Sequence, residues 1–237
     1  AGMADYRMYA GKPVVIKPKS TNFGLGITIL KHNYDETDFK GALQIAFEHD
    51  NTLLIEKFIP GREFRIFIIN DEVVGILHRV PANVTGDGVL NIGQLIDRKN
   101  EDPLRGKGYR TPLEKIRKGR EEEMFLKQQG MDFNTVPKEG EVVYLRENSN
   151  ISTGGDSIDF TDDIDDSYKA IAVEAAKALN VKITGLDMMI QDIHAPATPD
   201  NYAIIEMNFN PAIHIHCYPF KGKNRHLNHK MIRALGF

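Results

Sequence analysis

The run IIEMNFNP at residues 204–211 is the most informative part of the sequence, because it places an acid and an amide inside an apolar β-strand pattern. Glu206 and Asn208 stand two residues apart, and side chains at i and i+2 leave the same face of a strand. A second run, GLDMMI at residues 185–190, carries Asp187 in the same apolar setting. A carboxylate in a strand is costly to bury unless it is paired or binds a cation. Oxygen ligands of this kind suit Mg²⁺, and a structural ion pair with a buried Arg or Lys is an equal alternative.

Helices and strands are predicted throughout the chain from hydrophobic period and turn residues. The predicted strands are residues 14–17, 27–30, 53–59, 64–69, 73–78, 142–146, 185–191 and 202–207. The predicted helices are residues 39–48, 92–99, 114–129 and 167–179. The first two strands form a hairpin with a glycine-rich tip, and the fourth and fifth form another around Asn70 and Asp71. The acidic run at residues 159–166 is interpreted as a solvated helix start rather than as a metal site.

The composition is that of a soluble globular protein. The chain has 237 residues, of which 41% are hydrophobic and 27% charged, which excludes a mini-protein, wholesale disorder and a membrane protein. Its formal charge of -3 gives no global attraction to nucleic acid or to an anionic membrane. The single cysteine, Cys217, excludes an intramolecular disulfide and favours a cytoplasmic location. No apolar run approaches ~18 residues, and the first residues carry no secretion signal.

A lysine followed by a glycine-rich loop lies near the start of the chain. Lys17 ends the run VVIK, and KSTNFGLG at residues 19–26 adds Lys19, two hydroxyl groups, Gly24 and Gly26. Glycines let the backbone approach phosphate oxygens, and lysines supply positive charge. The loop lacks the Walker spacing, and a loop of this kind is more often a plain turn. Because a candidate Mg²⁺ site lies in the same chain, nucleotide binding becomes the favoured interpretation.

An extended stretch and three arginines complete the candidate chemistry. The stretch IEKFIPGRE at residues 55–63 has main-chain groups and two carboxylates that suit an adenine edge and a ribose, although the bare pattern is only a strand and a turn. Arg65, Arg79 and Arg146 stand in or beside predicted strands, where they suit the charge of a transferring phosphoryl group. A plain surface arginine is the default interpretation of each one taken alone.

In their order along the chain, these motifs resemble the ATP-grasp superfamily of ADP-forming carboxylate–amine ligases. The shared order is the strand lysine of VVIKP, the loop NFGLG, the hinge EKFIPGRE and the acidic strand pair ending in EMNFNP. Residues 79–97, 145–162 and 205–222 more closely resemble the C-terminal glutathione synthetase module of bifunctional glutamate–cysteine ligase/glutathione synthetase. Cyanophycin synthetase has a related pattern.

The resemblance implies an α+β ATP-grasp fold, in which two α+β subdomains sandwich the nucleotide. Residues 1–60 are then expected to form the small lid subdomain with the glycine-rich loop, and residues 61–237 the large catalytic subdomain. The family places a further domain before the VVIKP strand, so we expect that this domain is absent from the chain.

The resemblance also implies roles for individual residues. Those implied to bind ATP are Lys17, Lys19, Gly24, Gly26, Glu56, Lys57, Phe58, Ile59 and Glu63. Those implied to bind substrates and acyl phosphate are Asn150, Ser152, Gly154 and Gly155, and the implied metal ligands are Asp187, Glu206 and Asn208. The implied catalytic residues are Arg146, Arg79 and Arg65. Some relatives carry an arginine two residues before the first metal aspartate, where this chain has Gly185, so one of these three must supply that charge.

The implied reaction is an acyl activation. A substrate carboxylate attacks the γ-phosphate of ATP, and an amine then displaces phosphate from the acyl phosphate to form an amide. The resemblance points to γ-glutamylcysteine and glycine as substrates, with ATP and two Mg²⁺ ions, or Mn²⁺ in their place, as cofactors. It implies fusion to a glutamate–cysteine ligase domain and is compatible with a homodimer. The alternatives are a cyanophycin-type or other γ-glutamyl amide ligase, and a non-catalytic nucleotide-binding module.

Two C-terminal motifs are discounted as separate sites. His214 and His216 form an H-x-H beside Cys217, but no fourth ligand is evident, so lining of the substrate pocket is favoured over a soft-metal site. Cys217 lacks a catalytic Cys-His signature, and packing or pocket lining is favoured for it. The basic stretch at residues 221–230 is interpreted as a solvated helix or a lid over anionic substrate rather than a nucleic-acid site.

Overall fold

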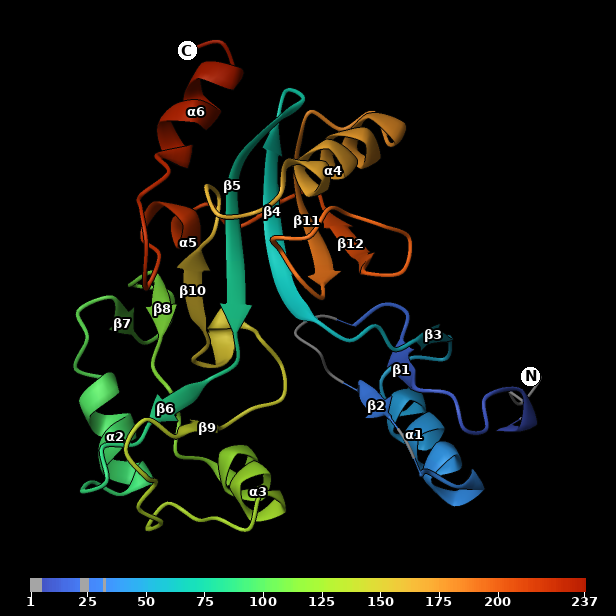
Figure 1. Ribbon diagram of the computed structural model, residues 1–237, viewed down its shortest axis with the longest axis vertical. Coiled ribbons are helices and arrows are strands. Elements are labelled where there is room, and N and C mark those ends of the chain that lie inside the picture. Colours follow the sequence, from blue (N-terminus) through green and yellow to red (C-terminus); the bar gives the residue numbers. More distant parts are fainter. Residues whose placement is uncertain (1–5, 22–25, 32) are drawn as a thin grey trace. The chain divides into compact units, whose positions relative to one another are not determined.

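The computed structural model describes residues 6–21, 26–31 and 33–237 (Figure 1). It divides into two compact units, Ala1–Pro60 and Gly61–Phe237. Each unit has its own sheet and its own hydrophobic core. Spanning a bilayer takes ~20 apolar residues in a helix. None of the helices in the described ranges is long and apolar enough to do so.

The first unit is a three-stranded antiparallel sheet packed against one helix. Its elements in chain order are η1 (Tyr6–Met8), β1 (Val14–Pro18), β2 (Thr28–Leu30), α1 (Glu36–Phe47) and β3 (Leu53–Lys57). β1 is the central strand, and the predicted hairpin of β1 with β2 is confirmed by their antiparallel pairing. The carboxylate of Asp35 caps the first turn of α1 by accepting from two backbone N–H groups. Phe39 and Ala46 of α1 are buried with Val14 and Ile16 of β1, which closes the core.

The second unit is built on a five-stranded antiparallel sheet. In spatial order its strands are β10 (Asp156–Asp159), β5 (Glu72–Val80), β4 (Arg62–Ile69), β11 (Ile183–Ile190) and β12 (Tyr202–Asn208). The predicted hairpin of β4 with β5 is confirmed, and Asn70 and Asp71 adopt φ values of 48° and 65° at its turn. Strands that are distant in sequence, such as β4 and β11, thereby become direct neighbours.

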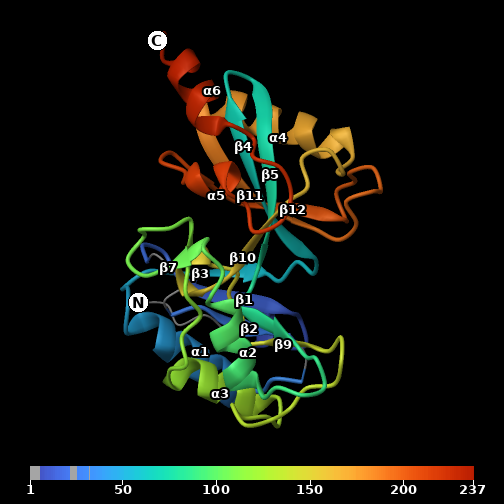
Figure 2. The same cartoon turned by 90° about the vertical axis from the view of Figure 1, so that its left-hand side faces the viewer.

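Helices cover both faces of this sheet, and its central strand β4 carries buried apolar residues on both sides. The covering helices are α4 (Asp166–Ala178), α5 (His214–Cys217) and α6 (Leu227–Ala234). Phe64 and Ile66 of β4 pack in the cluster that includes Tyr168 of α4. Phe67 packs in a separate cluster with Leu227 of α6. Figure 2 shows α4 and the α5–α6 pair on opposite sides of β4 and β5.

A smaller layer with its own core extends from the end of β5. Its elements are β6 (Asn83–Thr85), α2 (Ile92–Lys99), β7 (Arg105–Gly106), β8 (Leu113–Glu114), α3 (Arg120–Gln128), β9 (Val142–Tyr144) and η2 (Ile151–Thr153). β6 pairs with β9, and β7 pairs in parallel with β8. Val84, Ile96 and Leu126 are among the buried residues that join these elements. The predicted helix at residues 92–99 is confirmed with the same bounds as α2.

The predicted helix at residues 114–129 is wrong in its first turns. α3 begins only at Arg120, after the N-cap Gly119. Glu114 lies in β8 instead, and its carboxylate accepts hydrogen bonds from the backbone N–H groups of Gly108 and Tyr109. These local contacts fix an extended turn that a helical charge pattern does not reveal.

The acidic run at residues 159–166 is only in part a helix start. Asp165 caps α4 through the backbone N–H of Ser167. Asp159 is buried, however, and both Asp159 and Asp162 bind Arg225. The first part of the basic stretch at residues 221–230 lies along β10, and α6 begins only after it. The stretch is therefore not simply a solvated helix.

Candidate functional site

The candidate site is assembled by strand pairing in the second unit. Asp187 of β11 lies directly opposite Glu206 of β12 on one side and Arg65 of β4 on the other. Arg79 stands two residues beyond Leu77, which is the β5 partner of Arg65. Side chains at such positions share one face of the sheet. Four predicted site residues from four strands therefore converge.

Two arginines bind the carboxylate of Asp187. Arg65 donates from Nε to Oδ1 and from Nη2 to Oδ2, the latter at 2.8 Å, and Arg79 donates from Nη2 to Oδ2 at 2.9 Å. The Asp187 side chain is only 3% exposed. Burial alone raises the pKa of Asp187, but the hydrogen bonds and charges of the two arginines outweigh it and hold this pKa below its ordinary value. Asp187 therefore carries a negative charge at neutral pH.

Gly185 explains how Arg65 reaches this position. A Cβ atom at Gly185 would lie 2.8 Å from Cβ of Pro211 and 3.0 Å from Cδ of Arg65. Real Cβ atoms rarely approach this closely, so any larger residue at 185 would displace Arg65 or Pro211. Arg65, from the neighbouring strand, thus occupies the space that a side chain at position 185 would need.

Glu63 and Ser149 extend the network beyond Arg79. One Glu63 oxygen forms an ion pair with Arg79, and the other accepts the hydroxyl hydrogen of Ser149. Ser149 is buried and was not among the predicted site residues. Nothing in its local sequence marks it, because its contact is with a residue 86 positions away in the chain.

Glu206 and Asn208 form the open side of the network. Glu206 is exposed, and it accepts a 3.0 Å hydrogen bond from Nδ2 of Asn208. The described residues contain no group of three His, Cys, Asp or Glu side chains suited to a metal ion. Glu206 and Asn208 still present oxygen donors of the type that Mg²⁺ prefers, whereas both oxygens of Asp187 are held by arginine. The donor chemistry thus fits a divalent cation at Glu206 and Asn208, with Asp187 as the cross-strand neighbour of Glu206.

Arg146 lies in a different environment from the other two arginines. It follows β9, and its guanidinium binds Glu121 and Glu122 of α3. Among the described residues, it forms no hydrogen bond or ion pair with Asp187, Glu63 or Glu206. Of the three arginines, Arg65 and Arg79 are therefore the two that are placed at the strand carboxylates.

The predicted substrate residues lie in a tight turn around η2. Gly154 has a φ of 96°, and a Cβ at Gly155 would lie 2.8 Å from the carbonyl oxygen of Val80, so both positions favour glycine. The carbonyl oxygen of Asn150 accepts from the backbone N–H of Gly155 at 3.2 Å. Ser152 is half-buried within η2. The turn is thus held in one conformation by its own backbone.

The predicted nucleotide residues of the first unit are partly paired with one another. Nζ of Lys17 lies 2.7 Å from Oε2 of Glu56, across the β1–β3 pair. The residues at the end of β3 and just beyond it are Lys57, which is exposed, and Phe58 and Ile59, which are half-buried. Nζ of Lys31 lies 5.5 Å from the centre of the Phe58 ring, a contact that the sequence did not indicate.

The glycine-rich loop is described only at its two ends. Lys19 is exposed, and its backbone N–H donates to the carbonyl oxygen of Thr52 at 2.9 Å. Gly26 has a φ of 75°, a conformation that favours glycine. Gly24 lies outside the described residues.

His216 and Cys217 are core residues of the second unit. Cys217 is buried in the cluster of Phe67 and Leu227, which confirms packing as its role. His216 is completely buried, and its ring meets that of Phe67 edge-on at 5.4 Å. Lining of a substrate pocket is therefore wrong for His216, and burial lowers the pKa of His216 to about 3.

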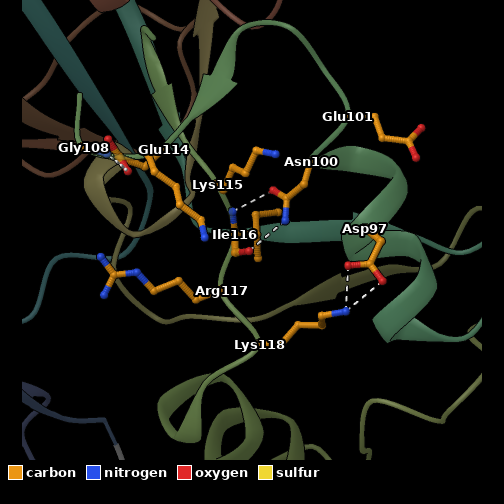
Figure 3. A pocket seen from close by; sticks show the side chains of 10 residues that line it. Asp97, Asn100, Glu101, Gly108, Glu114, Lys115, Ile116, Arg117 and Lys118 are labelled. Carbon is orange, nitrogen blue, oxygen red and sulfur yellow. Dashed lines mark hydrogen bonds and ion pairs between the residues drawn. The ribbon is translucent and has the colours of Figure 1, made fainter. Parts of the chain in front are cut away.

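A cavity of about 680 Å³ opens in the smaller layer, away from the residues predicted from sequence (Figure 3). Its wall is braced by Asn100, which exchanges two hydrogen bonds with the backbone of Ile116, and by an ion pair of Lys118 with Asp97. Its lining residues are Asp97, Asn100, Glu101, Lys107, Gly108, Glu114, Lys115, Ile116, Arg117 and Lys118. Acidic and basic side chains are mixed along this wall, so it shows no single charge preference.

Several known proteins are similar to this chain. Residues 3–91 match the family model described as D-ala D-ala ligase C-terminus. The Glutathione biosynthesis bifunctional protein GshAB of Desulfotalea psychrophila is 63% identical over 235 residues, and that of Clostridium perfringens is 57% identical over 231 residues. These matches cover 99% and 98% of this chain and 30% of each relative.

A solved structure extends the comparison. The crystal structure of a bifunctional glutathione synthetase from Pasteurella multocida matches with a TM-score of 0.73 and 46% identity. The match covers 97% of this chain and 31% of that chain. The chain therefore spans about 30% of the length of the relatives that it matches.

Proposed function

The chain is an ATP-grasp module homologous to a region of the glutathione biosynthesis bifunctional proteins, and from this premise we propose that it is an ATP-dependent carboxylate–amine ligase. The observation that carries the proposal is the convergence of Arg65, Arg79, Asp187 and Glu206 on one sheet face. Such a set combines oxygen ligands for a cation with fixed positive charge for a phosphoryl group. The substrates are γ-glutamylcysteine and glycine, the pair that yields glutathione.

The reaction needs no nucleophile from the protein. A carboxylate oxygen of γ-glutamylcysteine attacks the γ-phosphorus of ATP, and the bond to the leaving ADP oxygen breaks. The amine nitrogen of glycine then attacks the acyl carbon, phosphate leaves with the bonding electrons, and the nitrogen loses a proton. Catalysis therefore depends on positioning and on neutralising the charge of the phosphoryl oxygens.

The residues of the second unit divide these tasks. Arg65 and Arg79 supply positive charge beside the transferring group, and Asp187 holds both guanidinium groups in place. Glu206 and Asn208 would hold divalent cations, for which we propose two Mg²⁺ ions with Mn²⁺ able to substitute. When bound, they would neutralise the charge of the phosphate oxygens of ATP. Glu63 is the proposed ribose ligand, and Asn150, Ser152, Gly154 and Gly155 are the proposed substrate turn.

The first unit is the proposed nucleotide lid. Lys17 and Lys19 contact phosphates, Gly24 and Gly26 belong to the covering loop, and Glu56, Lys57, Phe58 and Ile59 frame the adenine. The ion pair of Lys17 with Glu56 supports this role, because it orients the lysine while leaving 18% of its side chain exposed. We propose that the remaining length of the full protein contains a glutamate–cysteine ligase domain, which supplies γ-glutamylcysteine.

A product assay tests the proposed function directly. The chain is incubated with ATP and Mg²⁺, γ-glutamylcysteine as the carboxylate, and glycine, aspartate or arginine as the amine, and ADP release is measured. We expect ADP and glutathione in equal amounts with glycine alone. ADP release only with arginine or aspartate would indicate a cyanophycin-type ligase. Measurable ATP binding without ADP release in any combination would support the non-catalytic module instead.

A further inference from the structure

Arg146 is held by two adjacent glutamates whose environments differ sharply. Oε1 of Glu122 accepts from Arg146 Nε at 2.7 Å and from Nη2 at 2.6 Å. Glu121 contacts the remaining nitrogen, Nη1. The side chain of Glu122 is 1% exposed, whereas that of Glu121 is 70% exposed. One edge of the guanidinium is therefore fixed in the interior, and the other is paired at the surface.

Glu122 is itself fixed by a second contact. Its Oε2 accepts from the backbone N–H of Gly119 at 2.9 Å, which caps the start of α3. At the other end of α3, Nε2 of Gln129 donates to the carbonyl oxygen of Tyr144 in β9 at 3.0 Å. α3 is thus tied at both ends to the segment that carries Arg146. The orientation of the guanidinium follows from the placement of the helix.

The contact with Glu121 is of a different kind. The Arg146 side chain is 13% exposed, but the Glu121 side chain is 70% exposed, so water and salt weaken this ion pair from the glutamate side. An anion with two oxygens, such as a phosphate or carboxylate, binds a guanidinium edge through two parallel hydrogen bonds and competes well against it. Nη1 of Arg146 is therefore the edge at which an incoming anion can exchange with a protein carboxylate.

We propose that Glu122 is a positioning residue for Arg146 and that Glu121 occupies the Nη1 edge until an anionic group of the substrate replaces it. This inference rests on the proposed function and on the expectation from the sequence that Arg146 is one of the catalytic arginines. It predicts opposite effects from two neighbouring residues of the same helix. Loss of Glu122 weakens substrate binding, and loss of Glu121 strengthens it.

Steady-state kinetics of Glu121→Gln and Glu122→Gln test the proposal. A glutamine at 122 keeps an oxygen for the cap of Gly119 but loses the charged contact with Arg146. We expect Glu122→Gln to raise KM for γ-glutamylcysteine about 10-fold, as for a broken buried charge contact. We expect Glu121→Gln to lower this KM about 2- to 3-fold with kcat little changed, as for removal of an exposed competing pair. Equal effects of the two variants, or an unchanged Glu122→Gln enzyme, would overturn the proposal.

Stabilisation by inorganic phosphate gives a second test that needs no turnover. The rise in Tm with added phosphate should be largest for Glu121→Gln, smaller for wild type and smallest for Glu122→Gln. Arg146→Lys keeps the charge and leaves the α3 cap untouched, so it should lose the response without the loss of folding that Glu122→Gln risks. If the variants follow this order but the wild-type chain makes no glutathione, the glutathione-forming function alone is refuted. A wild-type chain that makes glutathione without this order refutes the positioning role alone.

Discussion

Asp156 and Asp187 are two buried carboxylates on the same five-stranded sheet, and each is bound by two cationic side chains. Asp156 binds Arg105 and Lys99, with the Lys99 contact at 2.7 Å. Asp187 binds Arg65 and Arg79, with the Arg79 contact at 2.9 Å. The chemistry of the two clusters is nearly identical, so a difference in role must come from their surroundings.

The Asp156 cluster is closed on every side. The Phe220 ring covers both cations, with its centre 5.2 Å from Nζ of Lys99 and 5.5 Å from Cζ of Arg105. Arg105 also donates to the carbonyl oxygens of Glu114 and Gly154, at 2.8 and 3.0 Å. The cluster therefore pairs its charges internally and braces the turn that contains Gly154, although Nε of Arg105 is buried without a hydrogen-bond partner among the described residues.

The Asp187 cluster is open on one side. Glu206 beside it is exposed, and Asn208 binds Glu206 rather than an arginine. The exposed oxygens at this surface can bind a cation, and the fixed arginines beside them can bind a phosphoryl group. At Asp156 the aromatic cover excludes both. A buried ion pair therefore indicates a functional site only where exposed side-chain oxygens adjoin it.

The largest effect is expected from Asp156→Asn, which tests whether the closed Asp156 cluster stabilises the fold. The substitution leaves Arg105, whose side chain is 0% exposed, without its carboxylate partner. Breaking one side of a buried pair typically costs about 3–5 kcal/mol of unfolding free energy. Chemical denaturation should show this loss, whereas the matched Asp162→Asn, which breaks a half-exposed pair with Arg225, should cost under about 1 kcal/mol. Equal losses in the two variants would mean that the closed cluster adds no special stability.

Glu206→Gln tests whether the open Asp187 cluster acts in turnover. The exposed side chain contributes little to folding, so the Tm should stay near the wild-type value. Turnover should fall about 100-fold or more, because the charge that balances the cation and phosphoryl group is lost. Mg²⁺ titration of ADP release checks this, with Glu174→Gln on the exposed surface of α4 as the control. Full activity of Glu206→Gln would remove the metal assignment.

Much of the fold was predictable because hydrophobic period is a local signal. α2 and the β4–β5 hairpin were correctly placed by hydrophobic period and turn residues. β10 was missed because its buried residues include Asp156, Ser157 and Asp159, whose partners come from other elements. A polar strand that is buried by distant salt bridges has no hydrophobic pattern to reveal it.

The candidate site was predictable in its residues but not in its connections. The sequence indicated that Glu206 and Asn208 share one face of a strand, and the structure adds that Asp187 lies opposite Glu206 across β11 and β12. That Arg65 and Arg79 rather than Arg146 meet Asp187 depends on strand order, which the sequence does not specify. The sequence allowed a cation site or an ion pair, and the structure places an ion pair at Asp187 beside oxygen ligands at Glu206 and Asn208.

Gly185→Ala is expected to have the smallest effect, and it tests whether the position of Arg65 in the open Asp187 cluster matters. The added methyl group would press on Pro211 and on Arg65 Cδ, at 2.8 and 3.0 Å. Such overpacking costs about 1–3 kcal/mol, and because it moves Arg65 away from Asp187 it should also lower kcat. Gly41→Ala in α1 is the matched control, since its Cβ meets no atom within 4 Å and alanine favours a helix. If kcat of Gly185→Ala stays at the wild-type value while its stability falls, Arg65 shapes the sheet without acting on the phosphoryl group.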